Sequence, residues 1–97
     1  MKYVPSAVSR SLREIGKNLS IQHKLLNLTV EDVSQRAGVS VSTVSNAEHG
    51  KPVRTDSLLS MLNVLQMLQP MVAASDPYQT DIGQLRAVEQ LPQRVRR

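Results

Sequence analysis

The sequence has 97 residues, a net charge of +4, two histidines and no cysteine. This length suits one small domain, and the missing cysteines exclude disulfide bonds, thiolate catalysis and cysteine-based zinc sites. The sequence has no nucleophile paired with a base and no phosphate-binding glycine loop, so we expect neither an enzyme nor a bound metal or cofactor. Because Trp and Phe are also missing, a core must come from aliphatic side chains, which suits packed helices.

The charge is spread unevenly along the chain. Residues 1–54 carry eight Lys or Arg against four acids, residues 55–91 carry one Arg against four acids, and the last six residues add three Arg. A basic amino-terminal half favours a polyanionic partner. The sequence has no apolar run long enough to span a membrane and no signal-peptide stretch at its start. We therefore expect a cytoplasmic, nucleoid-associated protein with no membrane contact and no small-molecule substrate.

The first half of the sequence predicts three helices. Apolar spacing after Pro5 predicts a helix over 7–26, in which Gly16 permits either a close helix contact or a slight break. A second helix follows residue 29 and runs to about residue 37, with acidic residues in its first turn where the helix dipole favours them. A third helix is expected over 41–48.

The turn between the second and third helices carries clear local signals. Thr29 can cap the second helix, and Gly38 stands where a chain leaving that helix needs a positive φ. Ser40 is placed to cap the third helix. These signals predict two short helices joined by a tight turn.

The second half predicts a more apolar helix and a variable end. A helix is expected over 56–68, with eight apolar residues in eleven consecutive positions. These residues cover more than one face of the helix, so part of its apolar surface would stay exposed in so small a domain. Homodimerisation would cover that exposed apolar surface. Pro70 is expected to stop this helix, and the segment 71–74 is either a short β-strand between subunits or a loop. A short amphipathic helix is expected over 80–91, ended by Pro92 and followed by a basic tail.

The stretch LTVEDVSQRAGVSVSTVSNAEHG, residues 28–50, contains both short helices. We expect its shared inner face to consist of Val33, Ala37, Val39, Val44 and Ala47. The outer face of the third helix has short, uncharged side chains in place of the Lys and Glu of a solvated helix. Such a face can enter a DNA major groove and reach base edges. An ordinary helical hairpin is the alternative.

This stretch resembles the Xre-type, or Cro/CI-like, helix-turn-helix regulators, whose pattern runs roughly Leu-Ser/Thr-Gln-x-x-Leu/Val-Ala-x-x-Ala-Gly-Val-Ser-x-x-Thr-Ile/Val-Ser-x-x-Glu-x-Gly. The resemblance covers about residues 15–68 and implies an all-α, lambda-repressor-like domain of four to five helices. It implies a DNA-binding domain over residues 1–69 and a dimerisation strand with a partner-binding or flexible tail over 70–97. Two residues depart from the pattern. Val30 stands where a Gln often contacts phosphate, and Ala47 replaces a larger apolar residue, which predicts looser packing below the third helix.

By position, the resemblance also implies roles for individual residues. The residues expected to face DNA bases are Val41, Ser42, Ser45 and Asn46. The residues expected to contact phosphates are Lys24, Ser40, Thr43, Lys51 and Arg54. The dimer interface is expected at Leu59, Leu65, Leu68, Met71 and Val72. His23 and Glu48 are expected to pair and hold the first helix to the third, and Gly38 to shape the turn.

Within this family the chain is similar to HipB-type antitoxins of type II toxin-antitoxin systems. The similar features are Tyr-x-Pro-Ser near the start, the segment STVSNAEHG and the ending TDIGQLRAVEQLPQRVRR. This resemblance implies a dimeric repressor that binds double-stranded operator DNA, autoregulates its operon and holds a HipA-like serine/threonine kinase toxin. Two alternatives stay open: a stand-alone phage-like repressor without a toxin partner, and a protein-binding module that has lost its DNA contact.

Overall fold

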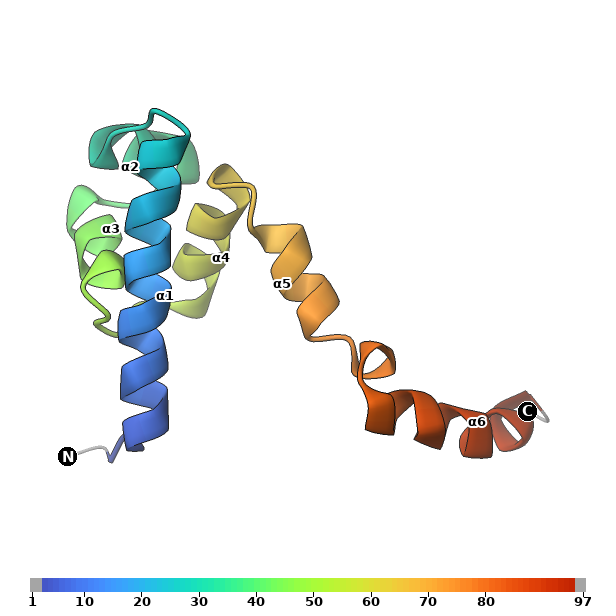
Figure 1. Ribbon diagram of the computed structural model, residues 1–97. Helices are drawn as coiled ribbons and strands as arrows, with labels where there is room; N and C mark the ends of the chain where they lie inside the picture. The colour runs from blue at the N-terminus through green and yellow to red at the C-terminus, as the bar shows by residue number, and fades with distance from the viewer. Residues whose placement is uncertain (1–2, 96–97) are drawn as a thin grey trace.

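The computed structural model describes the backbone of residues 3–95 and the side chains of residues 3–90, and its regular elements within these ranges are all helical (Figure 1). They are α1 (Ser6–Leu25), α2 (Val30–Ala37), α3 (Val41–Glu48), α4 (Thr55–Val64), α5 (Leu68–Ala74), the 3₁₀ helix η1 (Pro77–Gln79) and α6 (Asp81–Val95). The predicted all-α class is therefore confirmed. Helices α1 to α4 form a bundle, here residues 6–67, and α5, η1 and α6 lead away from it as an arm, residues 68–95 (Figure 1).

Helix α1 is continuous because Gly16 makes room for α3. A Cβ at this position would lie 2.5 Å from the carbonyl oxygen of Ala47 and 2.6 Å from that of Glu48. Gly16 therefore permits a close helix contact, and the alternative of a break in the helix is wrong. Ala47 is only 6% exposed. The looser packing expected below α3 is not found, because the two small residues let the helices approach closely.

Helices α2 and α3 each begin directly after the residue predicted to cap them. The backbone N–H of Thr29 donates to the carboxylate of Asp32, and the backbone N–H of Asp32 donates to the hydroxyl of Thr29, which closes a capping box. These hydrogen bonds from the backbone and side chain of Thr29 hold the pKa of Asp32 below its ordinary value of 3.8, since they stabilise the charged form. Ser40 caps α3 by accepting the backbone N–H of Thr43 at 3.0 Å.

The hydrophobic core lies where α1, α2, α3 and α4 meet. Among the described side chains, its buried members are Leu19, Val33, Val44, Ala47, Met61, Leu62 and Leu65. Ala37 and Val39 pack against this core and are half-buried. The predicted inner face of the two short helices is thus confirmed. Because α2 and α3 share this core, burial fixes their mutual position.

Helix α4 is shorter than the helix predicted over 56–68. The chain reverses at Gln66, which has a φ of 62°, and the backbone N–H of Met67 donates to the carbonyl of Leu62 at 2.8 Å. This reversal places Leu65 in the core, where it is 1% exposed. The expectation that Leu65 belongs to a dimer interface is therefore wrong, because the side chain is already covered within one chain.

The segment 71–74 is helical, so both alternatives expected for it, a strand between subunits and a loop, are wrong. It forms part of α5, in which Pro70 is the third residue. A proline in the first turn of a helix sacrifices no helical hydrogen bond, because the first N–H groups have no partner within the helix. Pro70 therefore lies in the first turn of α5 and does not stop α4, and the boundary expected between residues 69 and 70 falls inside a helix.

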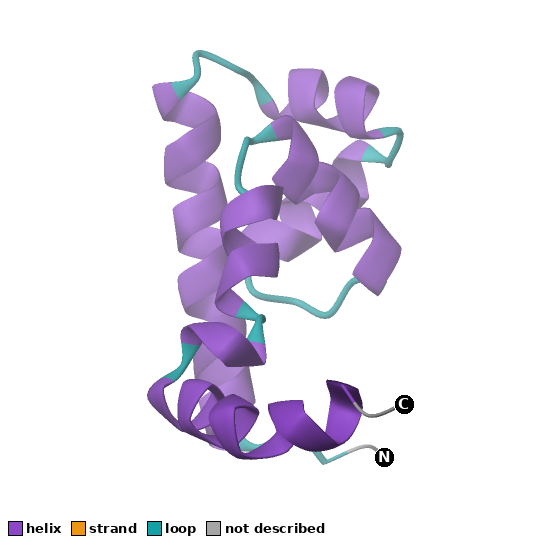
Figure 2. Cartoon of the chain, turned by 90° about the vertical axis from the view of Figure 1, so that its right-hand side faces the viewer, coloured by secondary structure: helices purple, strands orange, loops and turns teal. Residues whose placement is uncertain are grey.

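The rest of the arm consists of η1 and α6, which pack against each other. Helix α6 includes nearly all of the predicted segment 80–91, but it continues past Pro92 to Val95. An internal proline removes one hydrogen bond and favours a kink, yet it need not end a helix. Figure 2, which views the chain from the side of the arm, shows helices joined by short loops. The end of the basic tail, residues 96–97, lies outside the described residues.

Candidate nucleic-acid interface

The turn between α2 and α3 is held by local hydrogen bonds. Gly38 has a φ of 70°, and its backbone N–H donates to the carbonyl of Ser34 at 3.0 Å. The hydroxyl of Ser34 in turn donates to the carbonyl of Val39 at 2.6 Å. A glycine suits this left-handed conformation, which has no steric cost without a Cβ. The turn therefore sets the angle at which α3 leaves α2.

One face of α3 is fixed against the rest of the bundle. Val44 and Ala47 are buried, and the carbonyl of Ala47 lies against Gly16 of α1. Just after α3, Gly50 has a φ of 76° and lies so close to Arg13 that a Cβ would come within 2.8 Å of its Cα. These close contacts leave little freedom for α3 to tilt, so its opposite face is presented in a defined position.

The opposite face of α3 carries short side chains without charge. Val41 is 43% exposed, Ser42 is exposed, and Ser45 and Asn46 are half-buried about one turn later. The side-chain amide of Asn46 makes no hydrogen bond within the described part of the chain, so both its donors and its acceptor are free. Four residues expected to face bases therefore share the amino-terminal three quarters of one helix.

A shallow hollow lies between α3 and the start of α4. Its lining residues are Thr43, Asn46, Pro52, Val53, Arg54 and Ser57. The hydroxyls of Ser40 and Thr43 lie 2.8 Å apart at the first turn of α3 and hydrogen-bond to each other. The structure thus brings Ser40, Thr43, Asn46 and Arg54 to one side of the bundle, where the sequence reasoning expected base and phosphate contacts.

The expected cationic residues lie at the surface. Lys24 and Lys51 are exposed. The guanidinium of Arg54 makes an ion pair with the carboxylate of Asp56 at 2.9 Å, which the sequence reasoning missed. Both side chains of this pair are largely exposed, at 82% and 69%, so the pair contributes little and can exchange for another anion.

Residues 24–68 match a protein-family model whose description is helix-turn-helix. This segment is therefore similar to helix-turn-helix domains. The match runs from the end of α1 to the first residue of α5, and it supports a DNA-binding regulator of the Xre type that the sequence resembles. No curated protein matches the chain. The arm after Leu68 lies outside the match.

The pair expected between His23 and Glu48 is present in the structure. The Nδ1 of His23 lies 2.7 Å from the Oε2 of Glu48, and the two side chains are only 7% and 12% exposed. The contact joins α1 to the last residue of α3. It therefore adds a polar contact to the close packing around Gly16, on the side of the domain away from the expected DNA face.

His49 is a residue at the edge of the expected DNA face that the sequence reasoning did not include. It directly follows α3, is exposed, and donates from its Nδ1 to the carbonyl of Ser45 at 2.7 Å. This hydrogen bond orients the ring and leaves Nε2 without a hydrogen bond to the described part of the chain. The spacing of four residues from Ser45 is the signal that could have placed His49 on this face.

Val30, the first residue of α2, packs against the core, where its side chain is half-buried. The sequence departs from the family pattern at this residue, so no phosphate contact is expected from it.

Among the described residues, no three His, Asp or Glu side chains gather in a way that could hold a metal ion. No helix in the described ranges combines the length and apolar character needed to cross a membrane.

Proposed function

We propose that this chain is a sequence-specific, double-stranded DNA-binding transcriptional repressor whose α3 enters the major groove. The observation that carries the proposal is the contrast between the two faces of α3. Its inner face is buried at Val44 and Ala47, whereas its outer face carries short uncharged side chains that are exposed or half-buried. A major groove about 12 Å wide admits such a helix.

In this proposal, Val41, Ser42, Ser45 and Asn46 face the bases. The free amide of Asn46 can bond both N6 and N7 of an adenine, and Val41 can contact a thymine methyl group. The hydroxyls of Ser42 and Ser45 can donate to or accept from either type of base pair. Asn46 is expected to contribute most to base discrimination, because a bidentate contact is more selective than a single hydrogen bond.

A second set of residues is proposed to contact phosphates. They are Lys24, Ser40, Thr43, Lys51 and Arg54, and they fix the register of the domain on the duplex without reading its sequence. Arg54 would exchange its exposed ion pair with Asp56 for a phosphate. Because each neutralised phosphate releases counterions, binding is expected to weaken steeply with added salt.

The repressor is proposed to work as a homodimer on a palindromic operator. A dimer places two copies of α3 in successive major grooves, so half-sites are expected about 34 to 36 Å apart, one turn of DNA. With Leu65 buried in the core, the proposed interface residues are Leu59, Leu68, Met71 and Val72. Of these, Leu59, Met71 and Val72 are 38%, 37% and 52% exposed, and Leu68 is half-buried.

The direct test begins with a selection of binding sites from a library of random DNA duplexes. On the selected duplex, Asn46→Ala is expected to weaken binding by about 1 to 3 kcal/mol and to relax the preference at one base pair. Arg54→Ala should weaken binding to all duplexes alike and lower the slope of log affinity against log salt by about 1. Gln90→Ala, in the arm, is the control and should change neither quantity. Equal effects of Asn46→Ala and Arg54→Ala on random and selected DNA would contradict these roles.

The finer proposal is that this repressor is a HipB-like antitoxin that autoregulates its operon and binds a HipA-like kinase toxin. Its support is the resemblance to that group, together with an arm that the helix-turn-helix match does not include and that leaves large apolar side chains exposed. A pull-down with the tagged chain from its native cells should recover a serine/threonine kinase together with operator DNA. Recovery of DNA alone would favour a stand-alone repressor, and recovery of protein without DNA would favour a protein-binding module.

A further inference from the structure

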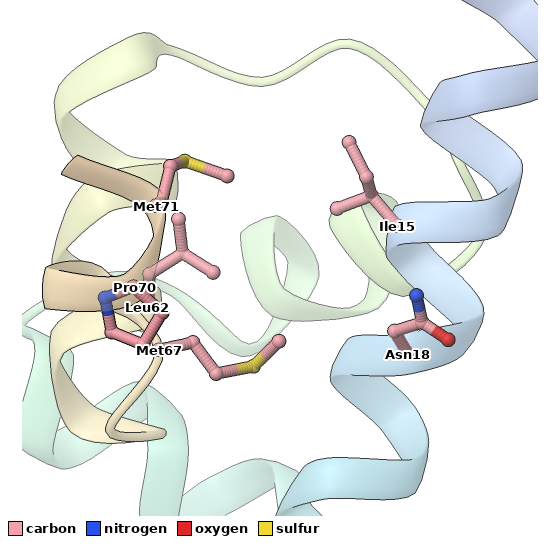
Figure 3. Close-up of a pocket in the computed structure, with 6 residues that line it drawn as sticks. All are labelled: Ile15, Asn18, Leu62, Met67, Pro70 and Met71. Atoms are coloured by element: carbon pink, nitrogen blue, oxygen red, sulfur yellow. The ribbon is translucent and has the colours of Figure 1, made fainter. Parts of the chain in front are cut away.

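An apolar groove lies between α1 and the start of the arm. It has a volume of about 330 Å³ and is lined by Ile15, Asn18, Leu62, Met67, Pro70 and Met71. Figure 3 shows Ile15 and Asn18 on α1, across the groove from Met67 and Met71. Asn18 is the one lining residue with a polar side chain. This groove therefore suits an apolar occupant.

The outer face of α1 continues the apolar surface beyond the groove. Val8 precedes Ile15 by seven residues, and Ile21 and Leu25 follow Asn18 by three and seven, so helical spacing places them on or beside the same face. Val8, Ile21 and Leu25 are 47%, 46% and 71% exposed. An exposed apolar strip of this kind usually marks an interaction surface.

The arm carries a second apolar strip of similar character. On α6, Ile82, Leu85 and Val88 follow one another at intervals of three and are 66%, 61% and 71% exposed. Helix α6 packs against η1, but it projects away from the bundle (Figure 1). Its apolar face therefore stays uncovered within one chain.

The charges around the two surfaces are of opposite sign. Within residues 68–95, the arm has three carboxylates, Asp76, Asp81 and Glu89, against two Arg residues, Arg86 and Arg94. By contrast, α1 has one Glu against four basic residues, Arg10, Arg13, Lys17 and Lys24. Asp81 and Glu89 lie four residues before and after Leu85, so the apolar face of α6 has a carboxylate toward each end. This face complements a groove bordered by a basic helix.

We propose that the groove of each chain holds α6 of a second copy, so that two chains exchange their arms around a twofold axis. The inference rests on the homodimer of the proposed function and names the segment that forms it. The occupant is the partner's α6 because α5 contributes Pro70 and Met71 to one wall of the groove and then carries its own α6 away. Twofold exchange covers both apolar strips of both chains in one closed assembly.

The first test measures the mass of the full-length chain in solution by light scattering over a range of concentrations. The wild-type chain is expected to be a dimer, and Leu85→Glu is expected to raise its dissociation constant on the order of 100-fold, because the charge must enter an apolar groove. Gln84→Glu adds the same charge on another face of α6 and should leave the dimer intact. Circular dichroism would show that the helix content of both variants is retained.

The outcomes of this test separate the inference from the proposed function. A dimer that survives Leu85→Glu as well as Gln84→Glu would overturn the arm exchange alone, because another surface, such as that of Leu59, would then hold the chains together. A wild-type chain that is monomeric at every concentration would overturn both the exchange and the proposed dimer. The proposed DNA binding is tested separately, by measuring the affinity for a selected half-site, and does not depend on either result.

A second test uses the absence of cysteine from the sequence. Oxidation of the double variant Asn18→Cys/Glu89→Cys is expected to give a disulfide-linked dimer, since residue 89 of one chain would lie at the groove of the other. The control Asn18→Cys/Gln84→Cys should cross-link much less. A disulfide within one chain would place α6 in its own groove, and equal cross-linking of the two variants would show no defined contact. Either result would overturn the proposal.

Discussion

The bundle and the arm are both helical, but they bury very different amounts of apolar surface. In the bundle, α1, α2, α3 and α4 each supply buried side chains to one core. By contrast, no described side chain of the arm is buried. Most helical stability in proteins comes from packing, not from intrinsic propensity. The bundle can therefore be stable within one chain, while the arm gains stability when it packs against a partner. Four changes test this difference.

The largest expected effect comes from emptying part of the core. Leu65→Ala should lower the free energy of unfolding by about 3 kcal/mol, because it removes a fully buried side chain and leaves a cavity. Leu85→Ala, in the arm, should change it by less than about 0.5 kcal/mol when the protein is dilute enough to be monomeric. Urea unfolding followed by circular dichroism measures both. Similar losses in the two variants would contradict the division into a packed bundle and an unpacked arm.

The second largest effect on stability is expected from replacing a closely packed glycine by alanine, which can be compared in the bundle and in the arm. Gly16→Ala should lower the stability of the bundle by about 2 kcal/mol, since the new methyl group meets the backbone carbonyls of α3. A methyl group at Gly83 would clash with the backbone of Pro77, but both residues belong to the arm. Gly83→Ala should therefore shift α6 against η1 and leave the thermal midpoint of the bundle unchanged. A loss at Gly83 as large as that at Gly16 would mean that the arm unfolds together with the bundle.

The junction between the two regions offers a smaller gain. Gln66 holds a φ of 62°, in the left-handed region that glycine occupies without steric cost. Gln66→Gly is expected to raise the unfolding free energy by about 0.5 kcal/mol, because the release of strain outweighs the added freedom of the unfolded chain. Thermal unfolding of the two chains side by side checks this. A lower midpoint for the variant would show that the Gln66 side chain contributes more than its backbone strain.

The smallest effect is a pH dependence that belongs to the bundle. The pKa of Asp32 is lower in the folded chain than its ordinary value of 3.8, so its stabilising contribution is present above that value and is lost as the pH falls through the lowered pKa. Asp32→Asn should flatten the acid side of the stability curve, while its side-chain oxygen still accepts the Thr29 N–H. Acid titration of the unfolding free energy measures this slope. Superimposable curves for wild type and variant would contradict the assignment.

The bundle could be predicted closely because its signals are local. Thr29, Gly38 and Ser40 predicted the turn between α2 and α3, and the hydrogen bonds and φ angles of the structure occur at these residues. The predicted limits of α3, 41–48, agree with the observed helix. The His23 and Glu48 contact followed from family position and not from spacing.

The end of the bundle and the arm were predicted poorly because their signals are ambiguous. Gln66 adopts a left-handed conformation without a glycine, so the end of α4 and the burial of Leu65 had no local marker. A proline such as Pro70 fits two predictions equally well, because it can end one helix or occupy the first turn of the next. A short apolar run such as 71–74 fits a strand or a helix equally well by periodicity, and its neighbours decide between them.

At the site, the residues missed were those whose roles depend on a neighbour. Arg54 was expected to contact phosphate, and its pairing with Asp56 was missed because it depends on side-chain rotamers that spacing does not specify. His49 stands at an unspecified position of the quoted family pattern, and its hydrogen bond to Ser45 orients its ring along α3. Sequence reasoning therefore identified the face of α3, while the structure added the groups at its edges.

The central claim is that the outer face of α3 contacts DNA bases while the arm does not. Amide chemical shifts of the full-length chain, recorded with and without a selected DNA duplex, test it most directly. The amides of residues 41–46 are expected to shift most on binding, and those of residues 81–90 to stay unchanged. Shifts confined to residues 81–90, with residues 41–46 unaffected at saturating DNA, would contradict the claim.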